Sequence, residues 1–314
     1  MILKKPKFWD YGKGNLLAYV LLPLTLPVML NNFFLNLKKR KKNKKIKLIC
    51  IGNIYIGGTG KTPAVINLFK ILKKFDLNVS IGKKFYKSHI DEIDLLKKES
   101  NVIVDKSRKK IIQKAEKDKI DCLIFDDGLQ DKTISYDIQF VCFDSKSWIG
   151  NGLLIPSGPL REKLNSLKKY DAVFLKNLND NIDEKINLIR SYNSNIKVFS
   201  TNYEIRNLNK FDTSKNYLIF SGIGNPKSFR GLLEKNKFRI IEEIIFPDHF
   251  TYSKRNIDFI KKRSKEINAK IITTEKDYIK ISKIDPDDIE FLKVETKIDD
   301  EINFLNFIKS KIYD

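Results

Sequence analysis

The stretch IGNIYIGGTGKTP, residues 51–63, follows the apolar run KLICIG and precedes an amphipathic segment. A strand, a glycine-rich turn and a helix in this order are typical of a phosphate-binding loop, because the glycines let backbone N–H groups converge on an anion at the helix N-terminus. The predicted nucleotide-binding residues are Gly57, Gly58, Thr59, Gly60, Lys61, Thr62 and Pro63. We expect Lys61 to reach phosphate oxygens and Thr62 to offer its hydroxyl to Mg²⁺. Tyr55 replaces the first glycine of the usual pattern, so a tight turn with an incidental lysine is the alternative.

The rest of the chain alternates short apolar runs with amphipathic segments. The candidate strands are 47–52, 121–126, 139–144, 171–176, 217–222 and 270–275, and the clearest candidate helices are 63–75 and 106–117. Nearly continuous apolar strands separated by helices indicate a mostly parallel sheet with helices on both faces. We therefore predict an α/β fold of the P-loop NTPase type. The polar stretch 200–215 is expected to separate this core from a second, smaller α/β lobe.

The composition excludes a disordered chain and a disulfide-stabilised miniprotein, because 42% of the 314 residues are hydrophobic and only three are cysteines. Cys50, Cys122 and Cys142 each lie in an apolar run, which indicates buried, reduced thiols. The net charge of +21 comes mainly from lysine, since only nine of the 60 basic residues are arginine. We interpret this charge as a solvated surface and expect no specific nucleic-acid partner, because aromatic residues do not alternate with the basic ones. A nucleic-acid-binding protein is the rival interpretation. If nucleic-acid binding were independent of sequence and were lost at moderate salt, it would be only nonspecific adhesion to lysines.

The N-terminal region contains an apolar stretch, LLAYVLLPLTLPVMLNNFFL, at residues 16–35. Twenty helical residues would extend about 30 Å, the thickness of a bilayer core. Two prolines and two asparagines interrupt the stretch, so a segment lying in the membrane interface is as consistent with it as a span. Eight positive charges follow at 38–47, which favours a membrane anchor with the remaining chain on the cytoplasmic side. A cleaved signal peptide and a buried core helix are the alternatives.

Two acidic residues lie at the end of the candidate strand 121–126, one as its last residue and one directly after it. Asp126 and Asp127 stand where a carboxylate next to a phosphate-binding loop holds Mg²⁺ or its water shell. Arg161 and Glu162 lie in a loop rich in glycine and proline, 150–162. In a chain so poor in arginine, Arg161 suggests bidentate contact with a phosphate, and a loop salt bridge is the alternative.

Candidate acid–base groups are few, because the chain has only two histidines. Asp91 and Glu92 are expected in a polar loop after the first helix, and the sequence Pro247-Asp248-His249 closes an apolar run. An aspartate paired with an imidazole could accept a proton from an attacking hydroxyl. Ordinary surface roles are the alternative.

In this order, the motifs resemble the tetraacyldisaccharide 4′-kinase family of the lipid A pathway. The motifs are FWDYGKGN (8–15), GNIYIGGTGKTP (52–63), DEIDLL (91–96), DDGLQ (126–130), GNGLLIPSGPLRE (150–162), FSGIGNPKSF (220–229), FPDHFTY (246–252) and TTEKD (273–277). The resemblance implies ATP-dependent phosphorylation of the 4′-hydroxyl of a tetraacylated glucosamine disaccharide 1-phosphate, a glycolipid, to form lipid IVA. It also implies work at a membrane surface, with the catalytic body on the cytoplasmic face of a bacterial inner membrane.

The resemblance assigns roles to individual residues. The implied catalytic residues are Asp91 as base, His249 as its partner, Lys61 and Arg161, and the implied Mg²⁺ residues are Thr62, Asp126, Asp127 and Glu162. From the sequence itself we expect three parts: a membrane anchor and basic segment at 1–45, a P-loop kinase core at 46–205, and a second lobe at 206–314 that completes the active-site cleft.

Some positions depart from the family pattern. Ile81 replaces an arginine of the family, with Lys83 or Lys84 as a possible substitute, Asp131 replaces a histidine, and Phe250 replaces a second histidine. These departures affect contacts with the acceptor more than nucleotide binding. A membrane-tethered regulatory P-loop ATPase without a lipid acceptor is the alternative function.

Overall fold

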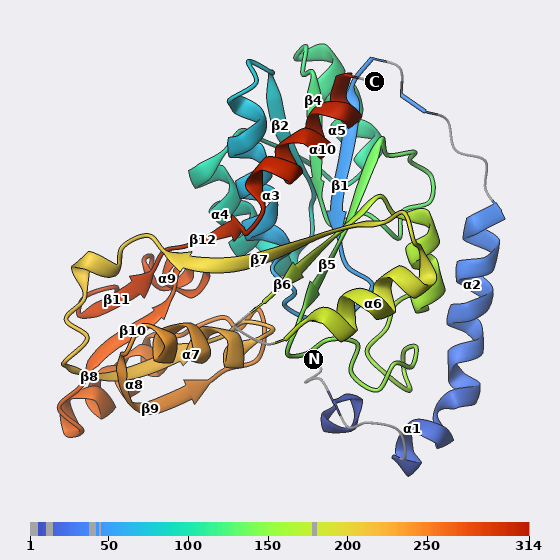
Figure 1. The fold of residues 1–314 in the computed structure, drawn as a ribbon. Coiled ribbons are helices and arrows are strands. Elements are labelled where there is room, and N and C mark those ends of the chain that lie inside the picture. The colour runs from blue at the N-terminus through green and yellow to red at the C-terminus, as the bar shows by residue number, and fades with distance from the viewer. Residues whose placement is uncertain (1–5, 11–14, 38–41, 44, 178–180, 314) are drawn as a thin grey trace. The chain divides into compact units, whose positions relative to one another are not determined.

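The computed structural model describes residues 6–10, 15–37, 42–43, 45–177 and 181–313. The chain divides into two compact units (Figure 1). The P-loop unit comprises Lys5–Lys84, Ser100–Asn202 and Lys297–Asp314, and the second unit contains Phe85–Glu99 and Tyr203–Thr296.

An eight-stranded sheet with the order β12-β7-β6-β5-β1-β4-β2-β3 lies mostly in the P-loop unit, although residues 203–205 of β7 and 294–296 of β12 belong to the second unit. Its strands are β1 (Lys47–Gly52), β2 (Val79–Lys84), β3 (Val102–Asp105), β4 (Cys122–Asp126), β5 (Ile138–Asp144), β6 (Ala172–Lys176), β7 (Lys197–Ile205) and β12 (Val294–Ile298). Every neighbouring pair from β7 to β3 is parallel, which confirms the predicted mostly parallel sheet. The four strands predicted within this unit correspond to β1, β4, β5 and β6.

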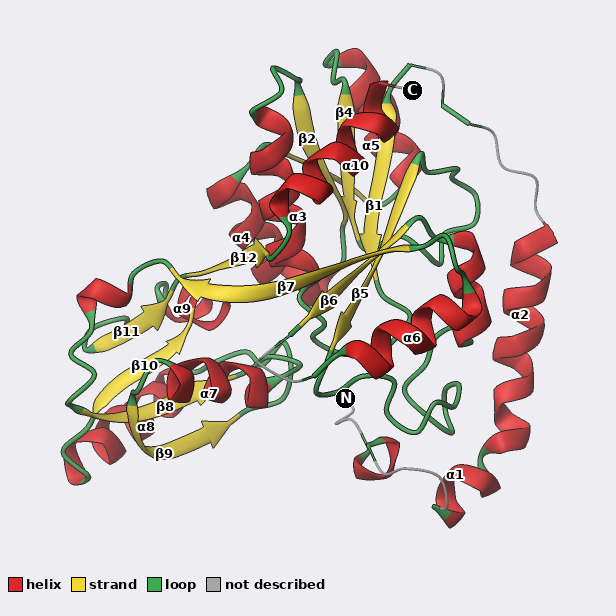
Figure 2. Ribbon diagram, viewed as in Figure 1, coloured by secondary structure: helices red, strands yellow, loops and turns green. Residues whose placement is uncertain are grey.

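Helices cover both faces of this sheet (Figure 2). They are α3 (Lys61–Lys73), α5 (Arg108–Lys117), α6 (Asp183–Tyr192) and α10 (Glu301–Tyr313), with the 3₁₀ helix η4 at Leu164–Lys169. Residues of α5 and α6 pack in one buried cluster with Phe125 of β4 and Val173 of β6. Neighbouring Phe174 points to the opposite face, because side chains alternate along a strand, and it contacts Phe304 of α10. The predicted helices 63–75 and 106–117 correspond to α3 and α5.

The second unit has a four-stranded sheet with the order β11-β10-β8-β9, and all of its pairs are parallel. Its elements are η3 (Lys87–His89), α4 (Ile90–Glu99), η5 (Leu208–Lys210), β8 (Asn216–Ser221), α7 (Pro226–Lys235), β9 (Arg239–Ile245), α8 (Lys254–Glu266), β10 (Lys270–Thr274), α9 (Glu275–Ile281) and β11 (Ile289–Leu292). Phe220 packs with Ile257 of α8, whereas Ile219 packs with Phe229 of α7, so the two helices cover opposite faces. The two strands predicted in this part of the chain are β8 and β10.

The N-terminal apolar stretch forms several short elements. After η1 (Lys7–Trp9) come α1 (Leu16–Val20), η2 (Leu22–Thr25) and α2 (Leu26–Leu37). Among the helices of the described residues, none is long and apolar enough to cross a bilayer. Most of the basic cluster predicted at 38–47 lies outside the described residues, since 38–41 and 44 are not among them.

The three cysteines are buried and free of disulfides, as predicted. Burial raises the pKa of the Cys142 thiol to about 12, although nearby Lys61 lowers it. These thiols are therefore protonated side chains of the core.

The aromatic contacts of β5 give a test of the core. Phe140 is fully buried, its ring lies 4.6 Å from that of Phe174, and it also contacts Phe304 and Phe307. We expect Phe140→Ala to lower the free energy of unfolding by about 3–5 kcal/mol in urea titrations followed by circular dichroism. Phe259→Ala is the control, because that ring is 58% exposed. Equal effects of the two substitutions would contradict the packing described.

Candidate active site

The glycine-rich loop connects β1 to α3 and requires glycine at two positions. Gly57 and Gly60 have φ values of 138° and 83°, in a region that side chains disfavour. Gly60 precedes α3 directly, so the loop leads into the N-terminus of that helix. The buried amide of Asn53 fixes the loop, because its Nδ2 donates to Thr59 Oγ1 at 3.0 Å and to the Gly57 carbonyl at 3.3 Å. The backbone is thus arranged to bind an anion.

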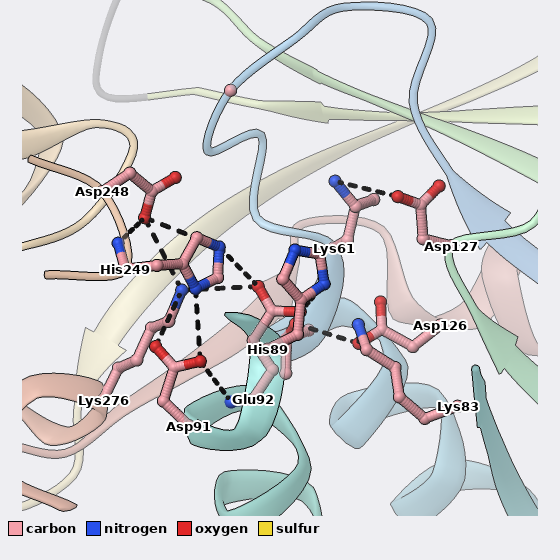
Figure 3. Close-up of polar contacts among 12 residues, drawn as sticks. Lys61, Lys83, His89, Asp91, Glu92, Asp126, Asp127, Asp248, His249 and Lys276 are labelled. Carbon is pink, nitrogen blue, oxygen red and sulfur yellow. Dashed lines mark hydrogen bonds and ion pairs between the residues drawn. The ribbon is translucent and has the colours of Figure 1, made fainter. Parts of the chain in front are cut away.

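Asp126 ends β4 beside the first turn of α3 (Figure 3). Its Oδ2 accepts hydrogen bonds from Thr62 Oγ1 at 3.1 Å and from Lys83 Nζ at 2.8 Å. Its other carboxylate oxygen, Oδ1, is buried and accepts no hydrogen bond from any described residue. A buried oxygen without a donor is expensive unless a cation or ordered water satisfies it. This carboxylate therefore fits a Mg²⁺ ion with its water shell.

Asp127 faces two cations of the same unit. Lys61 Nζ lies 3.9 Å and Arg161 Nη1 3.2 Å from Asp127 Oδ2. Burial raises the pKa of Asp127, but Lys61 and Arg161 outweigh it and lower the pKa below its ordinary value. Arg161 is held near the loop by its own backbone, because its N–H donates to the Ile54 carbonyl at 2.7 Å. Lys61, Asp127 and Arg161 thus form one charged group beside the glycine-rich loop.

Glu162 contacts a different set of side chains. Its Oε1 accepts hydrogen bonds from Gln130 Nε2 at 3.0 Å and from Tyr170 Oη at 3.1 Å, and it lies 3.4 Å from Lys132 Nζ. Across the described residues, no group of three or more histidine, cysteine, aspartate or glutamate side chains could hold a metal ion. A role for Glu162 near Mg²⁺ stays a prediction.

A second cluster lies within the second unit, around Asp91. The expectation that Asp91 and Glu92 lie in a loop is wrong, because both are in the first turn of α4. Carboxylates are favourable in this position, since they face the positive end of the helix dipole. Asp91 Oδ1 lies 3.2 Å from His249 Nδ1, so the structure brings the two predicted acid–base residues together (Figure 3).

Two lysines of α9 surround Asp91. Lys280 Nζ and Lys276 Nζ lie 3.2 Å and 3.5 Å from Asp91 Oδ2. Burial raises the pKa of Asp91, but the hydrogen bond with His249 and the two lysines outweigh burial and place the pKa well below its ordinary value. Lys276 also lies 3.3 Å from Glu92 and 3.7 Å from Asp248, and these carboxylates raise its pKa although burial lowers it. Asp91 is therefore ionised, and the two neighbouring lysines compensate its negative charge.

Sequence reasoning gave no role to several of these residues. Lys276 belongs to the motif TTEKD, and Asn53 belongs to the loop motif itself, so a signal existed for both. Arg108 donates to the backbone carbonyl of Asp127 and forms an ion pair with Asp131 at 3.2 Å. Because the chain has only nine arginines, each arginine is a candidate for a specific contact, and this was the signal available for Arg108.

A glycine-rich strand–loop–helix with an adjacent lysine, threonine and strand-end aspartate defines the P-loop class of nucleotide-binding α/β proteins. A family model described as tetraacyldisaccharide-1-P 4′-kinase matches residues 17–313. The tetraacyldisaccharide 4′-kinase of Pelagibacter ubique (strain HTCC1062) is 44% identical over 308 residues, which cover 98% of this chain and 97% of that protein. The tetraacyldisaccharide 4′-kinase of Rickettsia akari (strain Hartford) is 36% identical, with 98% of each chain covered.

A solved structure agrees with these relatives. The crystal structure of LpxK from Aquifex aeolicus in complex with ATP has a TM-score of 0.70 at 25% identity, and the match covers 95% of this chain and 100% of that one. The chain therefore belongs to the tetraacyldisaccharide-1-P 4′-kinase (LpxK) family of lipid A biosynthesis. It is a kinase, a phosphotransferase whose acceptor is an alcohol group.

The Lys83–Asp126 pair provides a test of the site's charge balance. Both side chains are nearly inaccessible to solvent, so Lys83→Met leaves the Asp126 carboxylate buried without this cation. We expect a loss of about 3–5 kcal/mol in the free energy of unfolding, measured in urea. The double variant with Asp126→Asn should recover most of the loss, because it removes the stranded charge. A Lys83→Met protein as stable as wild type would contradict this description.

Proposed function

We propose that this chain transfers the γ-phosphoryl group of ATP to the 4′-hydroxyl of tetraacyldisaccharide 1-phosphate and produces lipid IVA. The observation that carries the proposal is the hydrogen-bonded pair of Asp91 and His249 in a P-loop protein of this family. In such a pair the carboxylate can accept the proton of an acceptor hydroxyl, while the imidazole holds it in position.

The P-loop unit supplies the residues for the nucleotide. Backbone N–H groups of residues 57–62 bind the phosphates, while Lys61 and Arg161 neutralise their charge. Thr62 and Asp126 would hold Mg²⁺, and the unsatisfied Asp126 Oδ1 supports this assignment. Mg²⁺ would add neutralisation of the β- and γ-phosphate oxygens. Neutralising the negative charge of the phosphates makes ADP a better leaving group.

The second unit supplies the group that receives the proton. In the reaction, the 4′-oxygen bonds to the γ-phosphorus, the bond from that phosphorus to the bridging oxygen breaks, and the hydroxyl proton goes to Asp91. The low pKa of Asp91 is compatible with this role, because a loose phosphoryl-transfer transition state requires little removal of the proton before bond formation. His249 fixes the orientation of the carboxylate through its 3.2 Å contact.

The N-terminal segment supports a proposal for the location of the reaction. Residues of α1, η2 and α2 expose large apolar side chains, namely Leu16, Leu17, Tyr19, Val20, Leu22, Leu24, Leu26, Met29, Leu30, Phe33 and Phe34. A tetraacylated acceptor leaves a bilayer at a cost of about 0.8 kcal/mol per buried CH₂, so its enzyme must work at the membrane. We propose that this apolar surface inserts into the interface and keeps the catalytic body on the cytoplasmic face of a bacterial inner membrane. Asn32 of α2 donates to the Arg161 carbonyl, which links the surface to the loop that carries Arg161.

Asp91→Asn tests the proton acceptor. The substitution keeps the shape of the side chain but removes its charge, so we expect kcat to fall at least about 100-fold while the Kd for ATP stays within about twofold. Phosphate transfer from radiolabelled ATP to the glycolipid measures kcat, and calorimetry measures Kd. Asp94→Asn, on the same helix, should retain activity. Near-normal turnover of Asp91→Asn would exclude Asp91 as the base.

Lys61→Ala tests the phosphate site. Loss of the ammonium group should weaken ATP binding by at least about tenfold, because charge-assisted contacts to phosphate are lost. Lys73→Ala, at the other end of α3, is the control in the same calorimetric titration. Equal ATP affinity in the Lys61 variant and wild type would refute the phosphate-binding assignment.

The paired substitution Phe33→Ser and Phe34→Ser tests the membrane surface. The two rings are 58% and 61% exposed, so the fold should be unaffected. Because each buried ring contributes about 1.5–3 kcal/mol, binding to vesicles of phosphatidylethanolamine and phosphatidylglycerol should weaken at least tenfold in flotation assays. The exposed ring of Phe259 gives the control Phe259→Ser. Unchanged flotation of the double variant would exclude these rings from membrane contact.

A further inference from the structure

The two histidines of this chain stack on each other. The rings of His89 and His249 are nearly parallel, at 8°, and their centroids lie 4.6 Å apart. They are far apart in the sequence, yet both belong to the second unit. His249 contacts Asp91, but the proposed reaction gives no role to His89.

The His249 ring is held along its edge by polar contacts. Nδ1 lies 3.2 Å from Asp91 Oδ1, and Nε2 lies 3.8 Å from Glu92 Oε1. The backbone of His249 is also constrained, because its φ is 57° and its N–H donates to the Gly222 carbonyl and to Asp248 Oδ1. A residue held in this conformation is typical of a functional position. These polar contacts involve the ring nitrogens of His249, whereas His89 stacks on one face of the ring.

Glu92 lies close to both imidazoles. Its Oε2 is 3.7 Å from His89 Nδ1, while its Oε1 faces His249 Nε2. The charged groups around the pair are the carboxylates of Asp91, Glu92 and Asp248 and the ammonium groups of Lys276 and Lys280. Glu92 therefore contacts the edges of both rings.

We propose that His89 is a positioning residue of the phosphotransferase, which holds the His249 ring against Asp91 by stacking on its face. The inference rests on the proposed function for its effect on catalysis, but not for the packing of the rings. His89→Phe keeps an aromatic ring over His249 but removes the contact with Glu92, so it separates stacking from polar contact.

Proton NMR of the imidazole C–H groups reports on the stacking directly, because the chain has only these two histidines. At one fixed pH and without substrates, the ring current of the stacked partner should shift the His249 resonances. We expect His89→Phe to keep this shift and His89→Ala to remove it. Ser88→Ala, in the same 3₁₀ helix, should leave the resonances in place.

Kinetics then test the positioning role. We expect His89→Ala to lower kcat about tenfold with an unchanged KM for ATP, and His89→Phe to recover most of kcat. His249 resonances that are the same in wild type and His89→Ala, or a His89→Ala kcat within twofold of wild type, would overturn the proposal. Failure of the wild-type protein to phosphorylate the glycolipid would refute the proposed function instead, and the NMR spectra would still decide whether the rings stack.

Discussion

A carboxylate removed from water stays ionised only where fixed positive charges or hydrogen-bond donors compensate it. Three candidate functional residues, two in the P-loop unit and one in the second unit, depend on this constraint. Asp126 is paired with Lys83 and Thr62, Asp127 with Lys61 and Arg161, and Asp91 with His249 and two lysines. Because each of the three carboxylates has its compensating groups within its own compact unit, each cluster is organised before any ligand binds.

Such pre-organisation suits phosphoryl transfer, in which the protein mainly positions the reactants and neutralises charge. In the P-loop unit, Lys61 and Arg161 are already paired with Asp127 beside the glycine-rich loop. A bound triphosphate would replace Asp127 as the anionic partner of these two cations. The buried Asp126 Oδ1 atom accepts no hydrogen bond from the described residues, so it stays available to a cation. In the second unit, the low pKa of Asp91 keeps the carboxylate ionised at neutral pH.

The sequence predicted the features that are contiguous along the chain. The central strands are continuous apolar runs because both of their faces are buried, and the glycine-rich loop lies between such a strand and its helix. Strand β9 was missed because its sequence, RIIEEII, contains charges that suit a partly exposed strand. Asp91 was expected in a loop, although two acidic residues at a helix start are themselves a helix signal. The contacts of Lys83 with Asp126, of Lys276 with Asp91 and of His89 with His249 join segments that are distant in the sequence, so the spacing of residues along the chain does not predict them. The residue roles, the domain boundaries and the membrane surface stay predictions.

Phosphorus NMR of the glycolipid recovered after incubation with ATP and wild-type protein shows whether nucleotide turnover by this chain modifies a lipid alcohol. We expect a second phosphomonoester resonance on the disaccharide, formed in equal amount to ADP and absent when the acceptor is omitted. Production of ADP while the glycolipid keeps a single phosphate would refute the transfer and would identify a P-loop ATPase without a lipid acceptor.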